Sequence, residues 1–228
     1  MEAEGWEFAS DYRPARSIGG DFFDVFPIID QPRRLGVVIA DVSGKGISAA
    51  LLMAFARPVI RSALDRTADP VAALERTNHI LVDERRTGLF ITVLAGVLDL
   101  DTGVFTFANA GHETPLLARA DRSEPTWVLG GGPLLGVFGR LDLTPQTVEI
   151  RPGDRLLLYT DGITDAASPS GERFGDERLR AAALGTCVAA AWETCQAVIQ
   201  GVLAFQGDAD PADDLALLVL RRAPTSTA

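Results

Sequence analysis

The stretch Ala40-Asp41-Val42-Ser43-Gly44-Lys45-Gly46 lies between an apolar run, residues 35–40, and a long helical pattern, residues 47–66. The apolar run predicts a buried strand, and the small and apolar residues after the stretch recur at helical spacing. Gly44 and Gly46 allow the backbone to turn tightly and to approach a ligand closely. Asp41 therefore ends a strand where its carboxylate can meet other groups, although an ordinary strand-to-helix turn would show the same residues.

The composition excludes several classes of protein. The 228 residues, 47% of them hydrophobic, can bury one sizeable core. A formal net charge of −10 and the absence of a basic stripe argue against a nucleic-acid partner. No apolar run is long enough to span a bilayer, and the acidic N-terminus does not resemble a signal peptide. We therefore expect a cytoplasmic protein without a membrane span.

The two cysteines, Cys187 and Cys195, lie eight residues apart in one helical pattern. At this spacing they are about two turns apart, which is too far for a disulfide. We expect buried thiols in a reducing cytoplasm. Together with the two histidines of the chain, these distant cysteines do not make a zinc site.

The order of the predicted elements favours antiparallel sheets. Strands joined by a hairpin precede a pair of helices, and Asp69-Pro70 predicts the start of the second helix with Asp69 as its N-cap. A second series of strands, with a hairpin turn signal at residues 99–103, precedes another pair of helices and a closing strand. This order predicts an α+β fold of two packed sheets with helices outside. We expect a single domain over residues 1–222 and a disordered tail over residues 223–228. Because Met1 stands close to the first predicted strand, we also expect the chain to be the C-terminal part of a longer regulatory protein.

Four acids share one context, since each stands beside a strand end and within three residues of a glycine or another acid. They are Asp21, Asp41, Asp161 and Asp213. Burying one unpaired carboxylate is costly, and crowding several carboxylates adds repulsion. A hard divalent cation removes both penalties, and Mg²⁺ and Mn²⁺ prefer oxygen ligands. Taken singly, each acid also fits an ordinary turn, a bulge or a solvated loop.

Five motifs together carry a family resemblance. In chain order they are Ile18-Gly-Gly-Asp-Phe-Phe-Asp24, Ala40-Asp-Val-Ser-Gly-Lys-Gly46, Asn109-Ala-Gly-His112, Tyr159-Thr-Asp-Gly162 and Asp213-Asp-Leu215. With these motifs the chain resembles the SpoIIE/RsbU-like phosphatases, bacterial members of the metal-dependent type 2C serine/threonine phosphatases. The resemblance covers about residues 6–222.

The resemblance implies a four-layer α-β-β-α sandwich of two mainly antiparallel sheets flanked by helices, with two Mn²⁺ or Mg²⁺ ions at one edge. It implies that Asp41 bridges the ions with help from the backbone carbonyl of Val42, and that Asp21 holds one ion. Asp161 and Asp213 would hold the other. A hydroxide that bridges the ions would attack phosphorus directly, so that Asp21 and Asp41 act in catalysis through metal-bound water.

Four further motif residues are expected to support this site rather than to bind metal directly. They are Asp24, His112, Gly162 and Asp214. For His112 we favour a side chain that fixes its turn over a general acid. Arg13 and Arg16 lie where relatives grip the substrate phosphate with an arginine, but neither can be assigned from the sequence. Glu113 departs from the proline that often follows this histidine in the family.

By resemblance, the chain is a protein serine/threonine phosphatase that acts on phosphoserine or phosphothreonine. Its substrate would be a phosphorylated anti-sigma-factor antagonist of the STAS type in a bacterial stress or developmental pathway. Upstream sensor domains and a homodimer are compatible with the sequence. Two alternatives stay open: an inactive phosphatase-like binding module, and a metal-dependent hydrolase of small phosphates.

Overall fold

The computed structural model describes residues 3–83 and 88–224. Of the expected tail, residues 225–228 lie outside this described part. The chain divides into two compact units, each treated separately below. The first unit contains Met1–Ala15, Pro115–Val128 and Ile150–Ala228, and the second contains Arg16–Thr114 and Leu129–Glu149.

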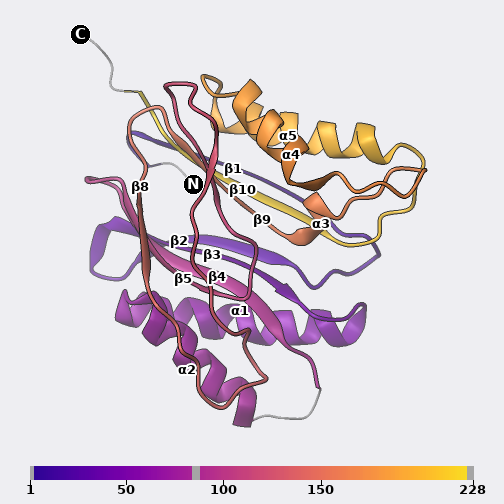
Figure 1. The fold of residues 1–228 in the computed structure, drawn as a ribbon. Helices are drawn as coiled ribbons and strands as arrows, with labels where there is room; N and C mark the ends of the chain where they lie inside the picture. Colours follow the sequence, from indigo (N-terminus) through magenta and orange to yellow (C-terminus); the bar gives the residue numbers. More distant parts are fainter. Residues whose placement is uncertain (1–2, 84–87, 225–228) are drawn as a thin grey trace. The chain divides into compact units, whose positions relative to one another are not determined.

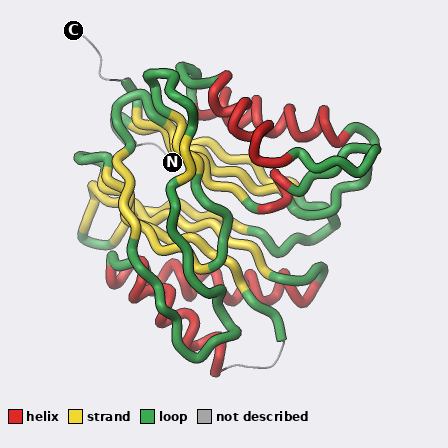
Figure 2. The backbone as a smooth tube through the Cα atoms, viewed as in Figure 1, coloured by secondary structure: helices red, strands yellow, loops and turns green. Residues whose placement is uncertain are grey.

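The second unit is an antiparallel sheet with two helices on one of its faces (Figures 1 and 2). The strand order is β2-β3-β4-β5-β8. The strands are β2 (Phe22–Ile28), β3 (Gln31–Val42), β4 (Ile91–Asp99), β5 (Val104–Ala110) and β8 (Gln146–Glu149), and the helices are α1 (Ile47–Thr67) and α2 (Pro70–Asp83).

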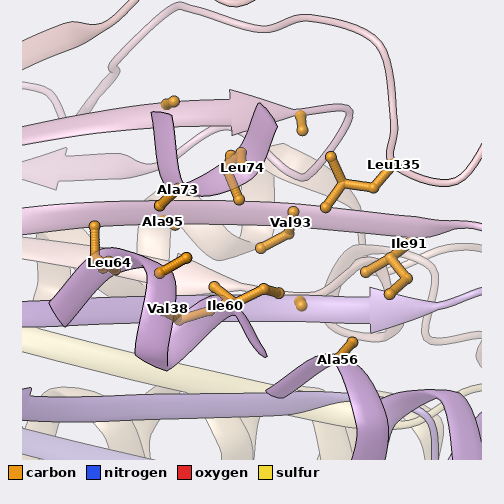
Figure 3. Close-up of a cluster of buried hydrophobic side chains, with 14 of the residues drawn as sticks. Val38, Ala56, Ile60, Leu64, Ala73, Leu74, Ile91, Val93, Ala95 and Leu135 are labelled. Atoms are coloured by element: carbon orange, nitrogen blue, oxygen red, sulfur yellow. The ribbon is translucent and has the colours of Figure 1, made fainter. Parts of the chain in front are cut away.

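The helices of the second unit cover the sheet with apolar side chains. Ile60 and Leu64 of α1 belong to the same buried cluster as Val38 and Val93 of the strands (Figure 3). Local signals define the ends of elements here. Asp69 accepts hydrogen bonds from the first backbone N–H groups of α2, which confirms its predicted N-cap role.

The β4–β5 hairpin turns where the sequence predicts it, at residues 99–103. The Asp99 carboxylate accepts the backbone N–H of Thr102 at 2.9 Å, and this hydrogen bond holds the pKa of Asp99 below its usual value. Gly103 has a φ of 80°, a conformation that favours glycine. The hairpin therefore follows from short-range residue preferences alone.

The first unit is a second antiparallel sheet with helices against one face (Figure 1). Its strand order is β1-β10-β9-β6-β7. The strands are β1 (Trp6–Arg13), β6 (Leu116–Ala118), β7 (Thr126–Trp127), β9 (Arg155–Tyr159) and β10 (Leu215–Arg222), and the helices are α3 (Asp161–Thr164), α4 (Gly175–Gly185) and α5 (Ala191–Gln206). Val198 and Val202 of α5 share a buried cluster with Leu157 and Val219 of the sheet. The expected α+β class, with two antiparallel sheets flanked by helices, is confirmed.

The expectation that both cysteines share one helix is wrong. A turn in which the N–H of Ala189 donates to the carbonyl of Thr186 separates α4 from α5. Cys187 lies in this connection, and Cys195 lies in α5. Both are free and buried, and burial raises the pKa of the Cys195 thiol to about 12. Cys195 is thus a core thiol, as the sequence predicts.

Among the described helices, α1 is long and apolar enough to cross a membrane by length and composition alone. Core helices of proteins without membrane spans pass the same test. In this chain Ala56, Ile60 and Leu64 of α1 are buried in the cluster of the second unit. Its Arg57 and Arg61 make ion pairs with β2.

Candidate metal centre

Asp21 and Asp41 lie at neighbouring strand ends in the second unit. The antiparallel register pairs Phe22 with Ala40, and one further step places Asp21 opposite Asp41. A Cβ atom at Gly20 would come within 2.9 Å of the carbonyl oxygen of Val42, closer than side chains tolerate. Glycine at position 20 therefore allows the backbone that carries Asp21 to approach the backbone that carries Asp41. Asp21 is 4% exposed, so its carboxylate needs compensation where it stands.

In the first unit, Gly162 likewise allows two backbone segments that carry candidate ligands to approach each other closely. Two hydrogen bonds hold the end of β9 against the start of β10. The backbone N–H of Thr160 donates to the Ala216 carbonyl at 3.1 Å, and the backbone N–H of Ala216 donates to the Thr160 hydroxyl at 3.0 Å. A Cβ atom at Gly162 would fall 1.9 Å from the carbonyl oxygen of Asp214. Glycine is thus required for the backbone beside Asp161 to meet the backbone beside Asp213.

A small cavity of about 10 Å³ lies beside Gly162 and Asp213 in the first unit. Its lining includes Asp165, Gln206 and Asp213. A cavity of this size holds about one water molecule. Asp165 is engaged elsewhere, because its carboxylate accepts a hydrogen bond from Arg173 at 2.8 Å.

Each unit contributes two of the four aspartates, Asp21 and Asp41 in one, Asp161 and Asp213 in the other. Among the described residues of either unit taken alone, no three His, Cys, Asp or Glu form a group that could hold a metal ion. The donor set consists of carboxylates and one carbonyl, without imidazole or thiolate. Such a set fits Mg²⁺ or Mn²⁺ and does not fit zinc. The assignment of the four ligands stays a prediction.

Asp24 and Asp214 have structural partners. Asp24 is 7% exposed, and its carboxylate accepts hydrogen bonds from Arg61 at 3.1 Å and from Arg57 at 3.4 Å, which ties β2 to α1. Arg61 also lies over the ring of Phe26, 4.4 Å from its centroid. The Asp214 carboxylate accepts the backbone N–H of Ala15 at 2.8 Å and so holds the loop after β1.

The turn that carries His112 is fixed by Asn109, a motif residue to which no role was assigned from the sequence. The Asn109 side chain accepts the backbone N–H of His112 at 2.8 Å and donates to the His112 carbonyl at 2.9 Å. The His112 ring instead bonds to β4, where Nδ1 lies 3.0 Å from the Thr92 hydroxyl. An asparagine at the start of a glycine turn was the available signal, because such side chains bond to nearby backbone.

The candidate arginines for phosphate binding are not equivalent. Arg13 pairs with Asp11 within β1, with Nε 3.0 Å from the carboxylate. Arg16 lies on the surface of the chain five residues before Asp21. The Arg13 side chain is therefore already engaged, and Arg16 is the better candidate of the two.

A protein-family model matches most of the chain. The family model described as Stage II sporulation protein E (SpoIIE) matches residues 31–223. This range includes the motifs of Asp41, Asp161 and Asp213. The motif at residues 18–24 precedes the matched range.

Two curated relatives extend this finding. Protein IcfG of Synechocystis sp. (strain PCC 6803) is 31% identical, with 78% of this chain and 32% of that protein covered. Phosphoserine phosphatase RsbU of Bacillus subtilis is 27% identical, with 92% of this chain and 61% of that protein covered. The chain thus spans less than two thirds of the length of either relative.

Solved structures share the fold. The SiaA-PP2C domain of Pseudomonas aeruginosa is similar at a TM-score of 0.83 and 23% identity, over 94% of this chain and 85% of that chain. The catalytic domain of the serine threonine protein phosphatase PstP, solved in complex with two manganese ions, is similar at a TM-score of 0.66 and 19% identity, over 96% of this chain and 98% of that chain. At these identities the similarities establish a PP2C-type fold.

Proposed function

Because the chain belongs to the family of Stage II sporulation protein E (SpoIIE), we propose that it is a protein serine/threonine phosphatase that depends on metal ions. The observation that carries the proposal is that all four motif aspartates are present beside strand ends. They are Asp21, Asp41, Asp161 and Asp213. The two glycines that admit close backbone approach, Gly20 and Gly162, support it, because each stands next to one of these acids.

The proposed ligands divide between two Mn²⁺ or Mg²⁺ ions. Asp41 and the Val42 carbonyl would serve both ions, Asp21 would hold one, and Asp161 with Asp213 would hold the other. When bound, such a pair of ions supplies an activated water for attack on a phosphate ester and offsets charge on its oxygens. The contribution of the chain is to fix the carboxylates at strand ends, where rigid backbones limit their movement.

The finer substrate assignment is also a proposal. We infer a cytoplasmic protein that removes phosphate from a phosphorylated anti-sigma-factor antagonist of the STAS type. The similarity to a protein named phosphoserine phosphatase supports a phosphoserine substrate. The five motifs, which resemble those of RsbU-like phosphatases, support the antagonist as the carrier of that phosphate. A single domain over residues 1–222, with sensor domains upstream and a homodimer, fits the same proposal.

The test is hydrolysis of a phosphoserine peptide and of p-nitrophenyl phosphate by the 228-residue chain with Mn²⁺. Asp41→Asn removes the bridging carboxylate at nearly constant volume, and we expect turnover to fall by on the order of 10²-fold or more, at least the loss seen when groups that support a metal are removed. Asp142→Asn, at an exposed position in the same unit, is the matched control and should keep wild-type turnover.

Two results would overturn the proposal. A folded wild-type chain that binds Mn²⁺ but hydrolyses neither compound would indicate a binding module. Faster hydrolysis of nucleotides than of a phosphorylated antagonist protein would indicate a hydrolase of small phosphates.

A further inference from the structure

A row of polar side chains crosses three strand ends of the second unit. The β2–β3 register ends with Phe22 opposite Ala40, so its continuation by one residue leads from Asp21 to Asp41, and the β3–β4 register pairs Asp41 with Thr92. Residues directly opposite in antiparallel strands share one face, with Cβ atoms about 4.5–5.5 Å apart. Their chain neighbours, among them Ala40, Val42, Ile91 and Val93, belong to the apolar cluster under the helices. Because side chains alternate along a strand, the polar row lies on the face away from α1 and α2.

His112 extends this row on the side of β4. Its ring Nδ1 lies 3.0 Å from the Thr92 hydroxyl, and its backbone N–H and carbonyl are both hydrogen-bonded to the Asn109 side chain. His112 is 8% exposed. The imidazole is therefore held in one place, and Thr92 is the side chain that stands between it and the Asp41 position.

The chemistry of a hydroxyl suits this intermediate position. A threonine hydroxyl carries one hydrogen and two lone pairs, so it can accept Nδ1–H from an imidazole and still donate its own hydrogen. A carboxylate only accepts. On its other side Asp41 faces Asp21, and like charges directly opposite each other are destabilising. A donor on the Thr92 side would offset that repulsion and restrict the orientation of the Asp41 carboxylate.

We propose that Thr92 is a positioning residue for Asp41, with its hydroxyl donating to the Asp41 carboxylate in the metal-loaded site while accepting Nδ1–H from His112. This inference rests on the proposed function, because it assigns Asp41 to a metal centre. Groups that hydrogen-bond to metal ligands typically change metal affinity or activity 10–100-fold when removed, roughly the range expected here. Thr92 then has a role beyond sheet packing, and His112 acts through Thr92.

The experiment compares Thr92→Val, which keeps the shape and removes the hydroxyl, with Thr92→Ser, which keeps the hydroxyl. Thr106→Val, the same change in β5 of the same sheet, is the matched control. Calorimetric titration with Mn²⁺ should show affinity reduced roughly 10–100-fold in Thr92→Val and within about threefold of wild type in the other two. Thr92→Val should also show a reduced kcat at saturating Mn²⁺, with the KM for a phosphoserine peptide little changed.

Nitrogen-15 spectra of the histidine rings give a readout independent of activity. The chain has two histidines, and His79→Gln identifies the signals of the other. Titration with Mg²⁺ should move the His112 ring signals in wild type and in Thr92→Ser, and should leave them unmoved in Thr92→Val. His112→Gln should weaken Mn²⁺ binding in the wild-type background and add nothing in the Thr92→Val background, because His112 acts through Thr92.

Several outcomes overturn the inference. One is an Mn²⁺ affinity of Thr92→Val within about twofold of wild type, and another is equal losses in Thr92→Val and Thr106→Val. Additive effects of Thr92→Val and His112→Gln also overturn it, as does a wild-type chain that binds no Mn²⁺. Should the chain bind Mn²⁺ with the expected Thr92 dependence yet hydrolyse no phosphoprotein, the proposed function fails and the inference stands.

Discussion

At the residue scale, two glycines decide whether the candidate ligands can stand close together. Gly20 lies against the Val42 carbonyl, and Gly162 lies against the Asp214 carbonyl. Neither position requires a left-handed φ, since neither is among the residues with positive φ. The requirement is for space alone, because the added Cβ would meet backbone that cannot rotate away.

Gly162→Ala tests this requirement. The alanine Cβ would fall 1.9 Å from the Asp214 carbonyl oxygen, so the start of β10 must shift. We expect a loss of roughly 1–3 kcal/mol in the free energy of unfolding, the range for overpacked sites, together with weaker Mn²⁺ binding. Urea unfolding and calorimetry measure the two effects.

Gly185→Ala is the control for this change. It lies in the same unit, and a Cβ atom there meets nothing within 4 Å. We expect this variant to keep both stability and metal affinity. Equal behaviour of Gly162→Ala and Gly185→Ala would show that the contact at position 162 does not constrain the site.

At the element scale, α1 is joined to β2 by charge as well as by apolar packing. Asp24 is buried, while the side chains of Arg57 and Arg61 are each 48% exposed. An exposed ion pair contributes little, but a buried carboxylate that loses its donors would be costly. The polar contact therefore holds the middle of α1 against β2, at a position three residues after Asp21 in the chain.

Asp24→Ala should lower the free energy of unfolding by roughly 1–3 kcal/mol, because it removes charge-assisted hydrogen bonds at a buried group. The two arginines stay hydrated in the variant, which keeps the loss near the lower end. Chemical denaturation measures the change. Asp101→Asn breaks the exposed pair with Arg33, in which the side chains are 62% and 47% exposed, and should change stability by less than about 1 kcal/mol. A loss as small for Asp24→Ala would contradict the role given to that residue.

At the scale of the whole molecule, neither unit is a single continuous stretch of chain. The first unit is assembled from three segments and the second from two. Each unit supplies one pair of acids, and under the proposed function both pairs serve one two-metal centre. A shared centre predicts that the effects of removing an acid from each unit are coupled, and this coupling can be measured without a metal-bound structure.

Asp21→Asn and Asp161→Asn remove one ligand from each unit. We expect each change to lower kcat/KM by on the order of 10²-fold or more, and the double variant to lose little beyond the worse single variant, because residues that act as one centre are not additive. Steady-state kinetics on a phosphoserine peptide gives all three values.

The pair Asp142→Asn and Asp208→Asn, one exposed residue from each unit, is the control and should leave kcat/KM unchanged singly and together. Fully multiplicative losses for Asp21→Asn and Asp161→Asn would contradict a shared centre.

Local patterns were enough to predict most elements of this chain. Period-2 and helical spacing predicted the strands and helices, an Asp-Pro pair predicted the start of α2 at Pro70, and residues 99–103 predicted a hairpin. These features depend on interactions between residues within a few positions of one another, and such interactions can be predicted from the local sequence. The break between α4 and α5 follows Gly185, which is a local signal, but the single helical pattern assigned to Cys187 and Cys195 ran across it.

By itself, the sequence determined the two-sheet α+β class and the four aspartates beside strand ends, since alternation and turn residues set both. Only the tertiary structure decided that Thr92 is paired with Asp41, that the His112 ring bonds to Thr92, and that Gly162 lies against the Asp214 carbonyl. Strand order and register arise from packing between residues far apart in the chain, and a one-residue slip of β4 against β3 would turn Thr92 to the face opposite Asp41.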